Sequence, residues 1–207
     1  MKTHNNLLQW VRRHKILAVF AATLLVVGAC KAAEMLTPAK EIALIIGEPW
    51  KDMQARSTAE IADDIPDEIW YRTPKELAYL RFADSEYGFK TPPAKFFMVG
   101  FNRGKIDSIR MSPQVEPLPF QEALDIVLDL QNQWRKSGWE LDEPEEFPAY
   151  DDTPVWHEAL KKCAALSTHW NAGKLYQLMV AIDCYEDSRY PDNKGYLVTI
   201  SMGKYRE

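Results

Sequence analysis

The sequence predicts an α+β domain in which an antiparallel sheet, built from hairpins, is covered by two main helices. Three observations lead to this fold class. Two alternating apolar stretches flank a turn at residues 102–105, helical spacing of apolar residues follows at 120–134 and 154–171, and two more alternating stretches end the chain. Each such strand or helix has one apolar face, and a sheet packed against helices buries both kinds of face.

The first half of the domain is expected to hold short elements. Residues 51–62 are compatible with a short helix, and 69–71 and 77–82 with short strands, while 88–93 are expected to form a loop. The hairpin follows, with strands at 95–101 and 106–111.

The second half begins with a helix over residues 120–134, and Gly138 lies where a C-terminal capping glycine is expected. A second helix is expected from residue 154 to 171, with an apolar stripe running from Trp156 to Trp170 and with Gly173 ending it. The chain closes with strands at 175–184 and 195–202.

The first 29 residues are typical of an export signal. Lys2, Arg12, Arg13 and Lys15 precede an apolar run of 14 residues, 16–29. Signal peptides have runs of this length, whereas a membrane-spanning helix needs about 20 apolar residues. The basic flank is expected to stay inside, which places the rest of the chain in the periplasm.

Val27-Gly-Ala-Cys30 ends the apolar run and resembles a bacterial lipobox. The resemblance implies that Cys30 becomes the lipidated first residue of the mature chain. Cleavage without lipidation and an uncleaved membrane anchor remain open alternatives. In the lipidated and uncleaved cases the N-terminus alone anchors the protein to the inner or outer membrane. Residues 30–45 would then be a tether and 46–207 a single α+β domain.

Removal of the first 29 residues changes the charge of the chain. They hold four of the 25 Lys and Arg residues and none of the 30 acidic residues, so the mature chain has a formal charge of 21 − 30 = −9. This charge argues against a nucleic acid or an anionic membrane surface as partner. It suits a partner protein that is basic at its contact surface, and it suits plain solubility equally well.

Cys163 and Cys184 are expected to be buried free thiols. If Cys163 lies on the helix at 154–171 and Cys184 on the next strand, their Cα atoms lie much farther apart than the limit of about 7 Å for a disulfide. An oxidising compartment would nevertheless favour their pairing.

The sequence contains none of the common catalytic or cofactor-binding motifs, and no enzyme activity, cofactor or metal is expected. His157 and His169 would lie about 18 Å apart on one helix, too far to share a metal ion. Ser167 and His169 would not face each other, because residues i and i+2 diverge on a helix. A hydrolase that uses His157 together with an acid is a remaining hypothesis.

The segment 140–154 is the most unusual part of the sequence, since it has seven carboxylates in fifteen residues. One interpretation is a solvated loop. The other is an exposed acidic and aromatic surface that binds a basic partner. The candidate partner-binding residues are Trp139, Glu140, Asp142, Glu143, Glu145, Glu146, Tyr150, Asp151 and Asp152. A second acidic stretch at 60–68, beside Trp70 and Tyr71, has the same ambiguity.

Three stretches of the chain, 87–97, 109–114 and 124–139, with the last ending in Gly138 and Trp139, together resemble a known family. They are similar to periplasmic immunity proteins of type VI secretion effectors, many of which are lipoproteins. The resemblance implies a protein that neutralises a cognate toxin by occluding its active site, with no catalytic residues of its own. The alternative is an envelope structural or assembly lipoprotein that binds a housekeeping partner.

Overall fold

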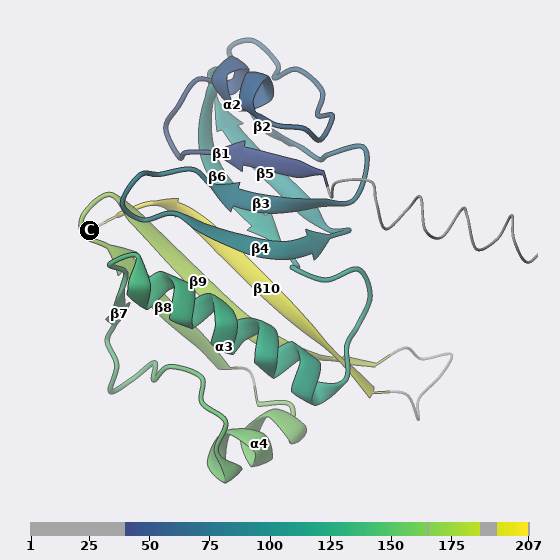
Figure 1. Ribbon diagram of the computed structural model, residues 1–207, viewed down its shortest axis with the longest axis vertical. Helices are drawn as coiled ribbons and strands as arrows, with labels where there is room; N and C mark the ends of the chain where they lie inside the picture. Colours follow the sequence, from purple (N-terminus) through teal and green to yellow (C-terminus); the bar gives the residue numbers. More distant parts are fainter. Residues whose placement is uncertain (1–39, 165, 187–193, 207) are drawn as a thin grey trace, which may run out of the picture. The chain divides into compact units, whose positions relative to one another are not determined.

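The computed structural model describes residues 40–164, 166–186 and 194–206. This part of the chain is α+β, as expected (Figure 1). Its elements are β1 (Glu41–Leu44), α2 (Trp50–Arg56), β2 (Ile69–Arg72), β3 (Ala78–Phe82), β4 (Phe89–Ala94), β5 (Phe97–Asn102), β6 (Lys105–Met111), α3 (Phe120–Lys136), β7 (Glu140–Asp142), α4 (Pro154–Lys161), β8 (Leu166–Ala172), β9 (Tyr176–Glu186) and β10 (Lys194–Lys204).

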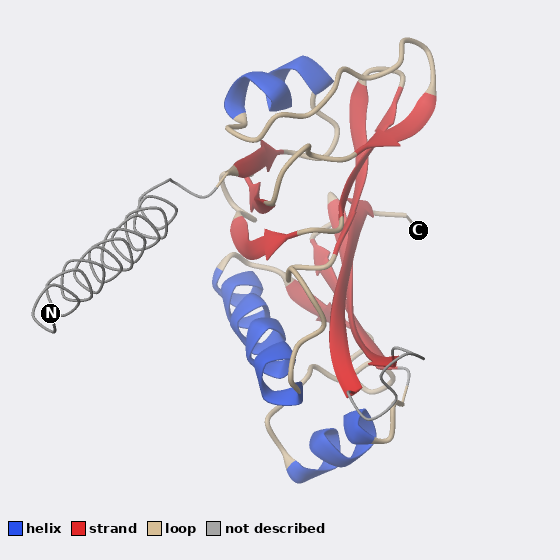
Figure 2. Ribbon diagram, turned by 90° about the vertical axis from the view of Figure 1, so that its right-hand side faces the viewer, coloured by secondary structure: helices blue, strands red, loops and turns tan. Residues whose placement is uncertain are grey.

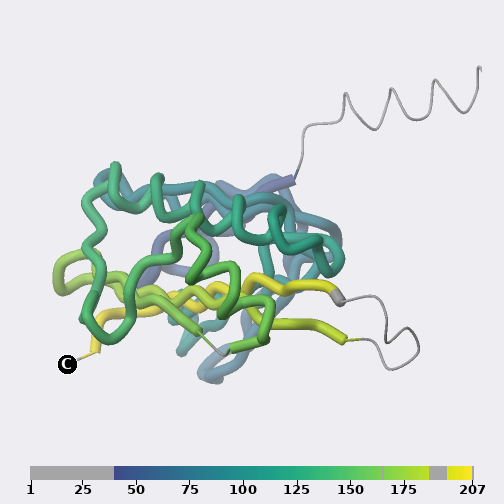
Figure 3. The backbone as a smooth tube through the Cα atoms, turned by 90° about the horizontal axis from the view of Figure 1, so that it is seen from below, coloured from purple at the N-terminus to yellow at the C-terminus, as the bar shows by residue number. Residues whose placement is uncertain are grey.

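Seven strands form one antiparallel sheet, in the order β2-β5-β6-β10-β9-β8-β7. The expected hairpin is its β5–β6 pair. Arg103 (φ 48°) and Gly104 (φ 77°) connect these strands with two consecutive positive φ angles, which are typical of a two-residue hairpin turn. The long strands β9 and β10 run side by side along the sheet (Figure 3).

The expected short strand at 77–82 is β3, but its place in a separate three-stranded sheet β1-β3-β4, in which β1 and β3 are parallel, was not predicted. The expectation of a loop at 88–93 was wrong, because β4 occupies this segment. Pro92 and Pro93 cannot donate a backbone hydrogen bond, but β4 is an edge strand and needs partners on one side only. Phe89, Thr91 and Ala94 of β4 are buried, and their burial against the core stabilises the strand.

The helices α2 and α3 and the small sheet lie on one side of the seven-stranded sheet, and α4 lies at one end of it (Figure 2). The long helix α3 buries its apolar face against β4, β9 and β10. The core therefore lies between the large sheet and a layer made of α3 and the small sheet. In the described part of the chain no second layer covers the opposite face of the large sheet, which we call the open face.

The expected helix at 154–171 was wrong in its second half. The helix α4 ends at Lys161, Cys163 adopts a positive φ of 57°, and residues 166–172 form β8 between β7 and β9. The spacing of Leu166 and Trp170 fits a helix and a strand equally well. Alternate burial of Thr168, Trp170 and Ala172 against the core decides for the strand.

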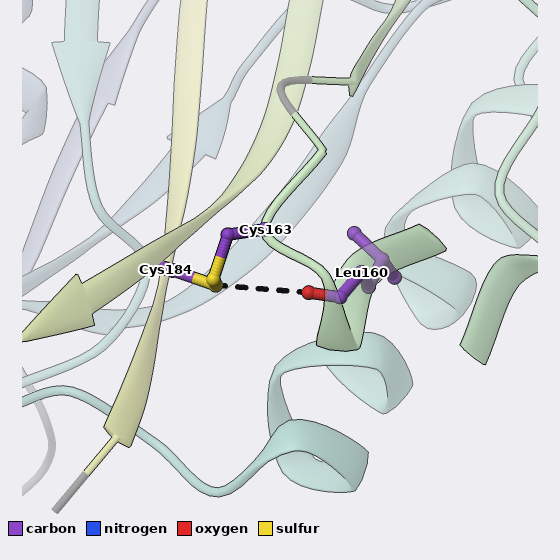
Figure 4. The surroundings of a disulfide bond; sticks show 3 residues. All are labelled: Leu160, Cys163 and Cys184. Atoms are coloured by element: carbon purple, nitrogen blue, oxygen red, sulfur yellow. Dashed lines mark hydrogen bonds between the residues drawn. A yellow bond between two sulfur atoms is a disulfide. The ribbon is translucent and has the colours of Figure 1, made fainter. Parts of the chain in front are cut away.

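This shorter helix also reverses the expectation for the cysteines. Cys163 lies just beyond α4, and Cys184 lies on β9, which α4 contacts. Their Cα atoms are 5.4 Å apart and the two residues form a disulfide (Figure 4). Neither residue is fully buried, so the prediction of two buried free thiols was wrong. The distance argument failed because it assumed a helix through residue 171.

The folded domain begins before residue 46. Ile42, Ala43 and Leu44 of β1 are buried, and β1 pairs with β3, so the end of the expected tether is part of the small sheet. The expected signal or anchor at 1–29 and the lipidation site Cys30 lie outside the described residues. Within the described residues, no helix has the length and hydropathy required to cross a membrane.

Candidate functional site

The candidate site is a groove of about 480 Å³ across the open face. Five adjacent strands, β6, β10, β9, β8 and β7, contribute to it. At about 4.8 Å between neighbouring strands, the groove spans about 19 Å. Its lining combines Arg110, Lys204 and Arg206 with Asp107 and Asp142, so the floor carries charges of both signs.

Strand register determines which side chains reach the open face. Side chains alternate between the two faces of a strand, and directly opposed residues lie on the same face. The pairs Arg110–Ser201, Ser201–Met179 and Met179–His169 are directly opposed, as are His169 and Asp142. These residues therefore form one row across the open face, while their neighbours such as Met202 and Trp170 are buried in the core.

Ser167 and His169 face each other, contrary to the expectation, because residues i and i+2 of a strand share a face. The Ser167 Oγ lies 3.2 Å from Nε2 of His169. The ring of His169 also stacks on Phe147, with the ring centroids 4.7 Å apart.

This pair does not extend to a catalytic triad within the described residues. Asp142 is opposite His169 in the sheet, yet no hydrogen bond or ion pair joins the two side chains. Furthermore, residues 169–171 of β8 are paired on both sides, with β7 and β9, so their ladder N–H groups are not available to bind an oxyanion.

The acidic segment adjoins one end of the groove, which Asp142 lines, and its Phe147 stacks on His169 there; we call this end the acidic rim. Glu140 and Asp142 lie on β7, the edge strand of the sheet, and the turn that follows exposes Glu143, Glu145 and Glu146. Within the described ranges, none of the seven carboxylates forms an ion pair with a Lys or Arg. Asp152 does bond His157 of α4. The segment is therefore a local concentration of uncompensated negative charge.

Tyr150 is buried, so the prediction that it belongs to an exposed binding surface was wrong. Its hydroxyl donates to the carbonyl of Leu166 and accepts from the N–H of Ile182. Its backbone N–H and C=O both bond the side-chain amide of Gln131 on α3, which is itself fully buried. Burial raises the pKa of the Tyr150 hydroxyl well above its ordinary value. Through these hydrogen bonds Tyr150 holds the acidic segment against the core.

Trp139 is also buried, so the prediction that it belongs to this surface was wrong as well. Its indole packs against Phe82 and Phe89, and its Nε1–H donates to the carbonyl of Tyr87. Next to it, Tyr176 donates to Asp84, and burial raises the pKa of Tyr176 to about 12.

An exposed aromatic surface does exist, at the opposite edge of the sheet. It lies beside the second acidic stretch, 60–68, for which the sequence did not distinguish a loop from a binding surface. Ile69, Trp70 and Tyr71 of β2 are 62%, 57% and 41% exposed, and the two rings stack with centroids 5.4 Å apart. A hollow of about 200 Å³ beside them continues toward Arg110 and Ser108, which also line the groove. The sequence did contain an indication, since three consecutive bulky apolar residues cannot all face a core on one side of the strand.

Within the described part of the chain, no group of three or more His, Cys, Asp or Glu side chains is arranged to hold a metal ion. Comparison of the chain with protein-family models, curated proteins and solved structures yields no match.

Proposed function

We propose that this protein is a periplasmic, membrane-anchored immunity protein, and that its open face and acidic rim bind a toxin delivered by type VI secretion and occlude its active site. The observation that carries the proposal is the acidic rim. Five carboxylates adjoin the open face and form no ion pair with a Lys or Arg among the described residues. They are Glu140, Asp142, Glu143, Glu145 and Glu146.

The dimensions of the site support a protein as the ligand. A groove about 19 Å wide on an uncovered sheet face is broad enough to receive a protein surface, and a standard interface uses about 800 Å² of each partner. The fixed carboxylates would attract a basic surface and orient it during the encounter. An enzyme that acts on an anionic substrate benefits from a basic surface around its active site, which concentrates the substrate, and a negatively charged protein bound there would exclude it.

A competition between sister cells tests the proposal. Cells that lack the gene should be killed by parental cells with an active type VI system, and the full-length chain should restore survival. The triple variant Glu143→Lys, Glu145→Lys, Glu146→Lys should fail to restore it, because reversing three charges at the rim weakens toxin binding about 10- to 100-fold.

The matched control reverses the same number of charges elsewhere. Glu122, Asp125 and Asp129 are exposed on α3, on the side of the sheet away from the groove. Their triple Lys variant should protect as well as the wild type. Full survival of the deletion strain under attack would refute the proposed function. Envelope defects of that strain in pure culture would favour the assembly lipoprotein instead.

A further inference from the structure

We propose that β2 is a homotypic pairing edge, through which two copies of this chain associate antiparallel about Trp70. The strand is the free edge of the seven-stranded sheet. It presents Ile69, Trp70 and Tyr71, each more than 40% exposed. An exposed apolar edge strand is a template for another strand, and proteins normally cover it or protect it with charges.

The hydrogen-bond pattern shows which backbone groups of β2 are free. The N–H of Arg103 donates to the carbonyl of Glu68, which makes this pair a hydrogen-bonded one. Hydrogen-bonded and non-hydrogen-bonded pairs alternate along antiparallel strands. Trp70 and Arg72 therefore direct their backbone groups at β5, and Ile69 and Tyr71 direct theirs away from it, toward the free edge.

The segment before β2 contacts the strand through Arg72, whose Nε–H donates to the carbonyl of Asp63. In the described residues its backbone forms no hydrogen bond with the backbone of β2. Asp64 lies against the β5–β6 turn. Its Oδ2 is only 3.3 Å from the position that a Cβ on Gly104 would occupy. Ile65 packs against the core. Ile61 pairs with Pro74, so the chain enters and leaves the segment that contains β2 at neighbouring positions.

The sequence of β2 indicates that the strand on this edge is a second copy of the chain, because two antiparallel copies of β2 are complementary in charge. The run Glu68-Ile-Trp-Tyr-Arg72 has opposite charges at its two ends. When two copies pair antiparallel about Trp70, Glu68 of each copy lies opposite Arg72 of the other. In the same register Ile69 lies opposite Tyr71, and these are the residues whose backbone groups are free, so four hydrogen bonds form about the two-fold axis.

This register puts the two Trp70 side chains opposite each other in a non-hydrogen-bonded pair. Their Cα atoms would lie about 4.5 Å apart, within the range of about 4.4–6.8 Å for a disulfide. The interface is small, so a Kd on the order of 10–100 µM is expected in solution. It lies at the edge opposite the acidic rim, and it does not depend on the partner that the open face binds.

Oxidative cross-linking of the full-length chain tests the register. Trp70→Cys should form a disulfide-linked dimer on a non-reducing gel. Val155→Cys, on α4 and 78% exposed, serves as the matched control and should not. Ile69→Cys should cross-link at least about fivefold less than Trp70→Cys, because two copies of residue 69 are offset along the strands and meet only diagonally.

Charge exchange then tests the pairing of the strand ends. Adding Glu68→Arg to Trp70→Cys creates two Arg–Arg pairs and should reduce the dimer about tenfold. Adding Arg72→Glu as well recreates opposite charges in the same register and should restore it. Retention of the wild-type thermal unfolding midpoint confirms that each variant is folded.

The proposal is overturned if Trp70→Cys gives no more dimer than Val155→Cys. It is equally overturned if Trp70→Cys cross-links to a different protein rather than to itself, or if the Glu68→Arg, Arg72→Glu exchange fails to recover what Glu68→Arg alone removed.

Discussion

The disulfide between Cys163 and Cys184 is expected to supply a large part of the stability of the domain. Its removal is a clean perturbation, because residues 31–207 contain no other cysteine. The variant is Cys163→Ser, Cys184→Ser, and its counterpart is the wild-type domain under reducing conditions. Both lose the same covalent link between the end of α4 and β9.

The magnitude follows from the sequence separation of 21 residues between the two cysteines. Closing a loop of this length removes about 11 cal/mol/K of entropy from the unfolded chain, which is about 3 kcal/mol at 25 °C. For a domain of this size such a loss lowers the melting temperature by about 6–12 °C. The folded state should change little, because β8 and β9 remain paired through their backbones.

The assay is urea unfolding of residues 31–207, followed by tryptophan fluorescence, for the oxidised, reduced and double-Ser forms. The reduced and double-Ser forms should coincide, about 3 kcal/mol below the oxidised form. A thiol reagent should find no free thiol in the oxidised protein after denaturation. Two reactive thiols there, or a double-Ser midpoint equal to that of the oxidised wild type, would show that the link and its loop argument are wrong.

Three further substitutions probe the core and its hydrogen bonds. Gln131→Leu leaves two backbone groups of the acidic segment unpaired and should cost about 2–4 kcal/mol in urea unfolding, while the exposed Gln121→Leu should change stability by less than about 0.5 kcal/mol. Trp139→Ala should cost about 3–5 kcal/mol and Trp70→Ala less than about 1 kcal/mol, and equal costs would contradict their different burial. Burial alone would raise the pKa of Asp84, but hydrogen bonds from two backbone N–H groups and a tyrosine hydroxyl outweigh it and lower the pKa below its ordinary value. Asp84→Asn should therefore be destabilising at neutral pH, and its difference from the wild type should shrink as the pH falls below about 4; a constant difference from pH 7 to pH 2 would refute this role.

Local patterns were sufficient for part of the fold. The β5–β6 hairpin and α3 were predictable because turn residues, periodicity and a capping glycine act over only a few residues. The segment 166–172 was not, because its apolar spacing fits two periods. Its strand conformation depends on pairing with β7 and β9, which are formed by other parts of the chain.

The candidate site was also predictable from the sequence only in part. The acidic rim could be located from sequence because charge is a property of the residues themselves. The pairing of Ser167 with His169, and the row from Arg110 to Asp142, could not, because they follow from strand register across five strands.

The sequence established the acidity of residues 30–207 and the two segments where aromatic residues adjoin carboxylates. Only the tertiary structure decided which of these aromatic residues are exposed. Trp139 is covered by Phe82 and Tyr87, more than 50 residues away in the chain, whereas Trp70 lies on a strand that has a neighbour on one side only. Burial depends on what the fold brings against a side chain, and that information is not contained in its immediate neighbours along the chain.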